Sequence, residues 1–503
     1  MKLRKKYIAV PIIALILFIS GCAEKTTNII ILHYNDFHGS VFPRKSPKSS
    51  EANTYIGGST HIAGYINKVR RENKNVLYLN AGDELKGTPI SDLTQGKALF
   101  DLLDIIKPDA FELGNHEFDY GLDNLRDYIN NAKFPVLCSN IVYKGKGDFN
   151  VKPYVIKEYE GVRIGIIGIV TQSLKHITSP SKVKEIEIIE SKKALFPIVA
   201  KLRGQVDILI VLSHEDIEVE KELAKSIPGI DIMITGHDHL ELRSPLKVGK
   251  TLIAQAGSNG EFIGRINLYY DTSSKKIIHK KSSLIRTLNN KLPEDPTVKE
   301  KVKDLESLLG NEFFEQIGFL EVPWNHRYRN TESGMGNFEA DVLKEFTNAD
   351  IAFVNSGSIR KGLGTGPITL NDIWEMFPFD DEAFLYELKG KRVLDILEQN
   401  CINKSDMLQL SGLRMTFDSQ SPPGKRILRV HIQGEDLDPE KIYKVTMLDY
   451  VAHHWDRYLG FDIKGIQHKN LGTFGKTEIS NHIKRQQRIR TGIENRIVDI
   501  YRE

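Results

Sequence analysis

The chain has 503 residues, 40% of them hydrophobic and 27% charged, which is an ordinary globular composition but too long for a single core. Its net charge of +3 becomes −1 if a leader carrying Lys2, Arg4, Lys5 and Lys6 is removed. Binding to a nucleic-acid polymer requires a clustered basic excess, so this balance argues against such a partner. With only three cysteines and no closely spaced pair, the sequence excludes a disulfide-built fold and argues against cysteine metal sites.

The N-terminus has the pattern of a secretion leader. A basic start is followed by an apolar run from Tyr7 to Ile19 that is too short to span a bilayer as a stable helix. The run ends in Ile19-Ser20-Gly21-Cys22, which resembles a bacterial lipobox. By that resemblance residues 1–21 are a lipoprotein signal peptide and Cys22 is lipidated, which anchors the protein outside the cytoplasm, on the periplasmic face of a membrane or at the cell surface. The alternative is a plain signal peptide whose cleavage region contains a cysteine.

Residues 28–289 are predicted to form the first domain. Apolar, β-rich runs there end abruptly in polar or small residues, and amphipathic stretches such as Ala63–Asn73 and Lys192–Leu202 lie between several of them. This alternation predicts helices around sheets that are buried on both faces. The runs are Ile29–Leu32, Val76–Leu79, Ala110–Leu113, Ile164–Val170, Ile208–Leu212 and Ile230–Thr235.

A linker is expected at 290–317, followed by a second domain at 318–503. The prolines of Leu292–Pro296 interrupt regular structure, and Thr297–Leu309 is predicted to be a charged helix capped by Thr297 or Asp295. A basic, solvated helix is expected at Glu478–Arg490. Cys138 and Cys401 fall one in each domain, and the sequence leaves open whether they pair. The second domain's expected strands and helices include Ile351–Val354, Lys444–Met447, Gly336–Phe346 and Arg392–Glu398.

Five strands of the first domain are followed by residue types that bind metals. Side chains at the carboxyl ends of neighbouring strands in an open α/β sheet converge on one crevice, so we expect them to meet. Carboxylate, amide and imidazole ligands without thiolates suit Zn²⁺, Mn²⁺ or iron better than Ca²⁺. The segments are His33–Gly39, Asn80–Asp83, Gly114–Asp119, Ser213–Glu215 and Gly236–His239.

This series resembles the calcineurin-like metallophosphatase signature. Its longer forms, Ile31–Gly39 and Gly114–Gly121, resemble the 5′-nucleotidase branch of that family. The resemblance implies an α/β protein: an N-terminal metallophosphatase β-sandwich flanked by helices, a linker helix and an α/β C-terminal substrate-binding domain. It also implies a phosphoesterase that hydrolyses nucleoside 5′-monophosphates to nucleoside and phosphate.

The same resemblance implies a centre of two divalent metal ions, which could be Zn, Mn, Co or Fe. Asp36, His38 and His239 would hold one ion and Asn115, His214 and His237 the other, while Asp83 would bridge the two. A bridging carboxylate can hold two cations about 3.5–4 Å apart. His116 would stabilise or protonate the phosphoryl transition state, with Asp119 orienting its ring. An alternative for Asp119 is a capping role at a helix start.

The second domain resembles the substrate domain of the same family. The segments that carry the similarity are Glu332–Asn337, Asn355–Arg360, Phe377-Pro378-Phe379 and Gln409–Leu413. By resemblance the residues that would contact a nucleotide are Asn355, Gly357, Arg360, Met407, Tyr450 and Asp456. Tyr450 stands where the family has one of two aromatic rings that clamp the base, and Asp456 where an acid binds the ribose. The alternative is that Tyr450 is a core aromatic residue.

Three departures from the family pattern fall in the segments expected to bind the nucleotide. Met407 replaces the second clamp ring, His454–Arg457 replaces a Gly-Gly-Asp-Gly loop, and Asp380-Asp381 replaces a pair of small or amide residues. They leave open a different substrate on the same centre: a cyclic nucleotide, a sugar-nucleotide pyrophosphate, or an ester like those of the thiosulfohydrolase branch. A non-catalytic surface binding lipoprotein is the alternative of another class. The sequence does not set the oligomeric state.

Overall fold

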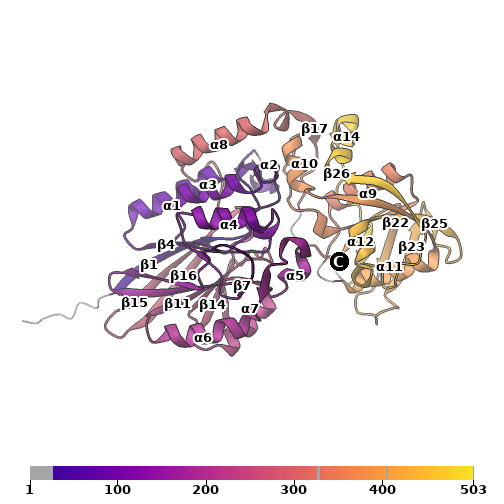
Figure 1. Ribbon diagram of the computed structural model, residues 1–503. Coiled ribbons are helices and arrows are strands. Elements are labelled where there is room, and N and C mark those ends of the chain that lie inside the picture. Colours follow the sequence, from indigo (N-terminus) through magenta and orange to yellow (C-terminus); the bar gives the residue numbers. More distant parts are fainter. Residues whose placement is uncertain (1–25, 52, 326–328, 404–405, 502–503) are drawn as a thin grey trace, which may run out of the picture.

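The structure is a computed structural model that describes residues 26–51, 53–325, 329–403 and 406–501. The expected signal peptide and the lipidation site at Cys22 lie outside these residues. Figure 1 shows two lobes, one containing the N-terminal sheets and the other containing the C-terminal strands and helices. Within the described residues, no helix is both long and apolar enough to cross a membrane.

The first lobe contains a six-stranded sheet built around the first predicted strand. Its order is β16-β15-β1-β4-β5-β6, with β1, β4, β5 and β6 parallel and β15 and β16 added as an antiparallel edge. The strands are β1 Thr26–Tyr34, β4 Val76–Asn80, β5 Ala110–Glu112, β6 Val136–Leu137, β15 Phe262–Asp271 and β16 Lys276–Arg286.

A second six-stranded sheet faces the first. Its order is β13-β14-β12-β11-β9-β8, and the four inner strands are parallel. The strands are β8 Tyr154–Tyr159, β9 Val162–Val170, β11 Ile208–His214, β12 Ile232–Thr235, β13 Leu246–Val248 and β14 Thr251–Ala254.

The two sheets pack face to face as a sandwich. Ile29 and Leu79 of one sheet and Ile164, Ile210 and Ile234 of the other belong to one buried apolar cluster, and each is fully buried. Burying both faces of each sheet explains why these strands are nearly continuous apolar runs rather than alternating ones.

Helices cover the outer faces of the sandwich (Figure 1). Ile62, Leu99 and Val298, from three helices, pack in one cluster with Ile30 and Tyr78 of the first sheet. Two further helices pack on the second sheet through a separate cluster. The helices on the first sheet are α1 Ser59–Glu72, α3 Lys97–Ile106, α4 Leu122–Asn131 and α8 Pro296–Leu309, and those on the second are α6 Ser191–Arg203 and α7 Ile217–Ser226.

The second lobe is built on a five-stranded sheet of order β21-β18-β25-β20-β26. Phe353, Val393 and Met447 lie in its buried core. A four-stranded sheet (β24-β23-β22-β28) and a three-stranded one (β19-β17-β27) adjoin it; their further strands are β17 Gln316–Leu320, β19 Gly366–Thr369, β23 Ile427–Ile432, β24 Glu435–Asp436, β27 Arg488–Ile489 and β28 Ile497–Asp499. The main elements are α9 Gly334–Thr347, β18 Ile351–Asn355, β20 Asp380–Lys389, α11 Gly390–Ile402, β21 Leu408–Ser411, β22 Leu413–Phe417, β25 Ile442–Leu448, β26 His468–Gly475 and α14 Lys476–Gln486.

The structure bears on three points of the sequence analysis. The sandwich implied by the family resemblance is confirmed, so the metal-ligand segments follow strands of two facing sheets, whereas the argument for their convergence assumed one open sheet. The predicted C-terminal helix ends at Gln486 because Gln487 adopts a positive φ of 62°, and the chain then forms β27, Arg488–Ile489, whose partner is β17, Gln316–Leu320. Cys138 and Cys401 are both free and buried, so they do not pair.

The linker helix α8 has a well-defined start at Asp295. Its side chain accepts hydrogen bonds from the backbone N–H groups of Thr297 and Val298, both at 3.0 Å, and from the Asn67 amide at 2.9 Å. Pro296 at the first helical position has no N–H group that needs a partner.

We therefore expect Asp295→Ala to destabilise the first lobe by about 0.5–2 kcal/mol, because two helix N–H groups lose their acceptor. Urea unfolding followed by circular dichroism measures this change. Glu294→Ala is the matched control, since Glu294 forms only an exposed ion pair with Lys299 and should cost much less. Equal stabilities of the two variants would contradict the capping role.

Candidate metal centre

The loops that follow β1 and β4 are held together beyond the ends of their strands. The N–H groups of Asp36, His38 and Gly39 donate to the carbonyls of Gly82, Asp83 and Glu84 at 2.9, 3.0 and 2.8 Å. These bonds continue the parallel pairing of β1 with β4 into the loops. They bring the side chains of Asp36 and His38 next to that of Asp83.

Five residues of the expected ligand set have left-handed backbone conformations. Such conformations are uncommon outside glycine and concentrate at functional sites, each at a cost of about 1–3 kcal/mol. They turn successive side chains toward the same point instead of to opposite sides of an extended strand. Their φ angles are 50° at Asp36, 49° at His38, 54° at Asp83, 76° at His237 and 58° at His239.

Two glycines allow the loops to approach this closely. A Cβ atom on Gly114 would lie 2.2 Å from the Asp83 carboxylate, and one on Gly82 would lie 2.6 Å from the backbone nitrogen of Gly114. Gly82 also has a φ of 85°, which disfavours other residues. The glycine pattern of the sequence therefore has a steric cause.

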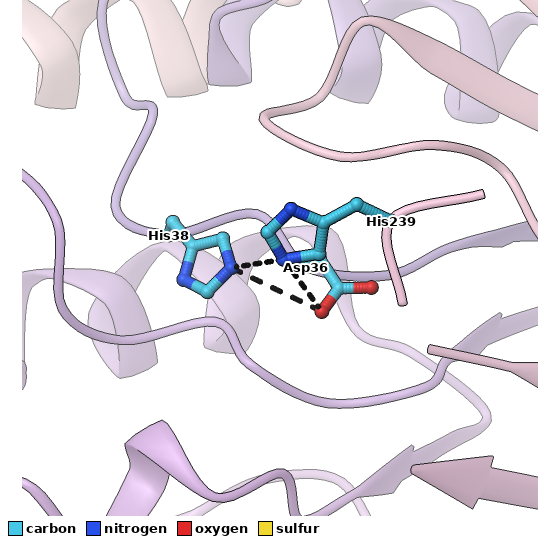
Figure 2. A group of neighbouring side chains, drawn as sticks. All are labelled: Asp36, His38 and His239. Carbon is cyan, nitrogen blue, oxygen red and sulfur yellow. Dashed lines mark hydrogen bonds and ion pairs between the residues drawn. The ribbon is translucent and has the colours of Figure 1, made fainter. Parts of the chain in front are cut away.

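One cluster of ligand atoms contains Asp36, His38 and His239 (Figure 2). The Nε2 atoms of the two histidines lie 3.0 Å apart, and they lie 3.9 and 3.4 Å from Asp36 Oδ1. The other carboxylate oxygen of Asp36 accepts a hydrogen bond from Asn35 at 2.6 Å, which fixes its orientation. Two imidazoles and one carboxylate thus converge on a single point.

A second cluster contains Asp83, His214 and His237. His214 Nε2 lies 3.1 Å from Asp83 Oδ2, and His237 Nδ1 lies 3.0 Å from the side-chain oxygen of Asn115. Asp83 also lies 4.0 Å from His38 Nε2, so its carboxylate stands between the two clusters. The structure brings together all seven residues that the sequence singled out as metal ligands.

The donor set fits divalent cations. His214 Nδ1 lies 2.7 Å from the Ala81 carbonyl, which can only accept, so Nδ1 carries a proton and Nε2 is the nitrogen that faces the cluster. His214 is fully buried, and its Nε2 lies 3.1 Å from the Asp83 carboxylate. A buried imidazole held through its other nitrogen, beside a buried carboxylate, is an arrangement that suits a metal ligand.

The surroundings keep the two carboxylates ionised. Burial by itself would raise the pKa of Asp83, but His214 and His116 outweigh it and hold that pKa well below its ordinary value. For Asp36, burial is likewise outweighed, here mainly by His239, and the pKa is again lowered. Both groups therefore remain acceptor-only ligands near neutral pH.

His116 and Asp119 form a hydrogen-bonded pair at the edge of the clusters. His116 Nδ1 lies 2.6 Å from Asp119 Oδ2, and Nε2 lies 4.0 Å from Asp83 Oδ2. Burial lowers the pKa of His116, but Asp83 and Asp119 outweigh it and raise the pKa above its usual value. The protonated ring can therefore donate a proton from Nε2 toward the clusters.

The second lobe supplies positive charge to the same place. Burial lowers the pKa of Arg360 to about 10, and the nearby Arg329 lowers it too, against the opposing effect of Asp83 and Asp36. Burial also lowers the pKa of His239, and both arginines add to that effect. Arg329 lies three residues before the Glu332–Asn337 segment, and the sequence analysis did not include it among the site residues. Its guanidinium group is of a type that suits an anionic substrate.

Asn355 and Gly357 meet around an acid that the sequence did not single out. Asp406 accepts hydrogen bonds from the Gly357 N–H at 2.7 Å and the Tyr458 hydroxyl at 2.5 Å, and the Asn355 amide lies 3.4 Å away. The Arg360 guanidinium lies 3.5 Å from the Gly357 carbonyl. Asp406 thus holds the loop that carries Arg360. Its only sequence signal was its position beside Met407.

The expected base clamp is not assembled as a pair of facing side chains. Met407 lines a cavity of about 260 Å³ with Cys401 and Phe417, and Tyr450 is not among the lining residues. Tyr450 is 39% exposed, and its ring contacts that of His454 in a tilted arrangement, with centroids 4.3 Å apart and an interplanar angle of 36°. Tyr450 is therefore not the core aromatic of the alternative interpretation. Asp456 is exposed and contacts Gln399 through its backbone carbonyl.

The fold and this constellation define a metallophosphoesterase. The calcineurin-like phosphoesterase family matches residues 29–241, and the 5′-nucleotidase C-terminal domain family matches residues 316–462. The chain belongs to the 5′-nucleotidase family and is a metal-dependent phosphoric ester hydrolase.

Known proteins resemble the chain over nearly its full length. The snake venom 5′-nucleotidase of Naja atra is 27% identical, with 93% of this chain and 98% of that protein covered. The crystal structure of a 5′-nucleotidase precursor from Thermus thermophilus superposes with a TM-score of 0.81 at 26% identity, covering 95% of this chain and all of that one. The Thermus thermophilus sulfate thiohydrolase SoxB shares the fold, with a TM-score of 0.79 at 20% identity, 94% of this chain and 97% of that one covered.

Because the Asp83 carboxylate stands between both clusters, we expect Asp83→Ala to lose metal binding at both clusters and nearly all phosphatase activity. Elemental analysis after loading with Mn²⁺ measures the metal content. Asp109→Ala is the matched control, since Asp109 lies directly before β5, at the opposite end of the strand, and contacts Tyr78, Lys157 and Arg70 instead. Substantial activity in metal-replete Asp83→Ala protein would exclude a shared carboxylate.

Proposed function

We propose that this protein is an extracytoplasmic, lipid-anchored phosphoesterase with two divalent metal ions that hydrolyses nucleoside 5′-monophosphates to nucleoside and phosphate. The observation that carries the proposal is the position of Asp83 between two clusters of buried ligand atoms, within the electrostatic reach of Arg360. In this proposal residues 28–289 form the catalytic domain, 290–317 the linker and 318–503 the substrate domain.

Each group has a role that its contacts support. One ion would be held by Asp36, His38 and His239, the other by Asn115, His214 and His237, and Asp83 would contact both. Two metal ions held in this way would supply Lewis acidity and would lower the pKa of an attacking water. Zn, Mn, Co or Fe would suit these ligands.

The remaining residues would bind the substrate and move a proton. Arg360 and Arg329 place positive charge where a phosphate dianion would approach the clusters, which favours binding and the charge of the transition state. Asp119 holds His116 through Nδ1, so the Nε2 proton can be shared with a phosphoryl oxygen or given to the leaving alcohol.

The nucleotide preference rests on Tyr450, whose exposed ring offers a face for stacking, with Asp456 as the expected ribose contact. The resemblance of Naja atra 5′-nucleotidase to this chain also supports a nucleotide substrate. A specific observation favours a second candidate, a phosphate ester without a base. The His454 ring already contacts the Tyr450 ring, and Met407 lines a cavity that Tyr450 does not line, so a two-sided base clamp is absent among the described residues.

The catalytic role of His116 can be separated from metal binding. We expect His116→Asn to retain its metal ions and to lower kcat by roughly 10²–10⁴-fold, the usual contribution of a positioned acid. Metal content and kcat are measured on the same preparation. Because His116 also lies close enough to His38 and Asp83 to act as a ligand, loss of metal with unchanged kcat per metallated site would assign it that role instead.

The proposed substrate is tested by phosphate release from AMP and from ribose 5-phosphate, which differ only in the base. Stacking on one aromatic ring is worth about 1–3 kcal/mol, so Tyr450→Ala should lower kcat/KM for AMP by roughly 10- to 100-fold. Turnover of ribose 5-phosphate should be unchanged. Equal losses on both substrates, or no hydrolysis of AMP by the Mn²⁺-loaded wild type, would leave a phosphoesterase whose substrate is not a nucleotide.

A further inference from the structure

The Glu117 side chain is the meeting point of the two loops that carry Asp83 and Asn115. It is 1% exposed and lies in the short 3-10 helix His116–Phe118. Oε1 accepts hydrogen bonds from the N–H groups of Glu84 and Leu85 at 2.7 and 3.2 Å. Oε2 accepts from those of Asp83 and Gly114 at 2.9 and 2.5 Å. One carboxylate thus binds four backbone N–H groups.

These bonds complete the pairing of the Asp83 loop. The carbonyls of residues 82–84 accept bonds from the loop after β1, so that side of the segment is paired with backbone. On its other side no strand follows, and the N–H groups of residues 83–85 donate to Glu117 instead. The carboxylate therefore takes the place of a neighbouring strand at the point where Asp83 leaves the sheet with a φ of 54°.

We propose that Glu117 is a positioning residue for the metal centre, which it serves by fixing the distance between Asp83 and Asn115 without contacting either ion. The inference rests on the proposed metal centre. Its geometric basis is that the Glu117 carboxylate accepts hydrogen bonds from the backbone N–H groups of Asp83 and of Gly114, the residue before Asn115. The same buried carboxylate therefore holds the backbone of both ligand-bearing loops in place. His116, the proposed acid, is its immediate neighbour, and the His116 N–H itself donates to Asp83 Oδ1 at 2.9 Å.

Replacement by glutamine tests the role because it keeps the size and removes half of the acceptors. In Glu117→Gln the side-chain amide would keep one acceptor oxygen. Its NH₂ group can only donate, so two of the four backbone N–H groups would lose their acceptor. Partners that orient metal ligands typically change metal affinity by 10- to 100-fold when they are removed. We expect Glu117→Gln to weaken Mn²⁺ binding by this factor in a chelator competition, to shift the visible spectrum of the Co²⁺-loaded protein, and to lower kcat at saturating metal.

Glu112→Gln is the matched control. Glu112 is a fully buried glutamate at the end of β5, and burial raises its pKa well above the ordinary value, so glutamine replaces a neutral acid of the same size there. We expect this variant to keep the metal affinity, the Co²⁺ spectrum and the activity of the wild type. Glu117→Asp, which keeps the charge but is one methylene too short to reach both loops, should show an intermediate loss of affinity.

The outcomes separate this inference from the function on which it rests. If the wild type bound no metal, the metal centre itself would fail. If the wild type bound two ions and Glu117→Gln bound them equally tightly with the same Co²⁺ spectrum, only the positioning role would fail. Thermal unfolding of the metal-free proteins gives the remaining test: metal-free Glu117→Gln and Glu117→Asp that did not fold would make Glu117 a structural residue and overturn the proposal.

Discussion

The site depends on one short segment, Gly82–Leu85, which is hydrogen-bonded along both of its edges. Its carbonyls accept N–H groups from the loop after β1, and its N–H groups donate to the Glu117 carboxylate. A loop with so many fixed backbone bonds can hold a residue such as Asp83 in a left-handed conformation, because the surrounding bonds offset the local cost. The backbone hydrogen bonds of this segment therefore set the direction of the Asp83 side chain, independently of a bound ion.

Charge balance is the second constraint on this arrangement. Asp36 and Asp83 are at most 2% exposed, and two buried carboxylates so close together would be unfavourable without compensating charge. His116, the proposed metal ions and the arginines of the second lobe all contribute positive charge. Because Arg360 belongs to the second lobe and the carboxylates to the first, the electrostatics of the site couple the two lobes. A dianionic substrate would meet positive charge from both.

The five segments that carry the candidate ligands could be found in the sequence because ligand-type residues follow recognisable strand ends, and the family resemblance then implied which of their residues bind metal. The apolar runs alone could not assign these strands to two facing sheets, since such runs look the same in a sandwich and in an open sheet, and the sandwich was expected from the family resemblance instead. Nor could the sequence show the role of Glu117, because whether a glutamate faces solvent or four backbone N–H groups depends on the path of a loop distant in sequence. The sequence likewise could not show that two adjacent residues have separate surroundings. Asp406 contacts Tyr458 and Gly357, whereas Met407, the next residue, lines the cavity next to Cys401 and Phe417.

Chemistry and specificity are built in different ways in this molecule. The metal centre is fixed by bonds between loops of the first lobe, so a change of one side chain around Tyr450 leaves its geometry in place. The surface around Tyr450 consists of side chains on a short helix, α12 Asp449–His453, and of the following residue His454. The His454 ring contacts the Tyr450 ring there, at a tilt of 36°, in a segment where the resembling family has small residues. Substrate choice can thus change on the second lobe while hydrolysis on the first stays the same.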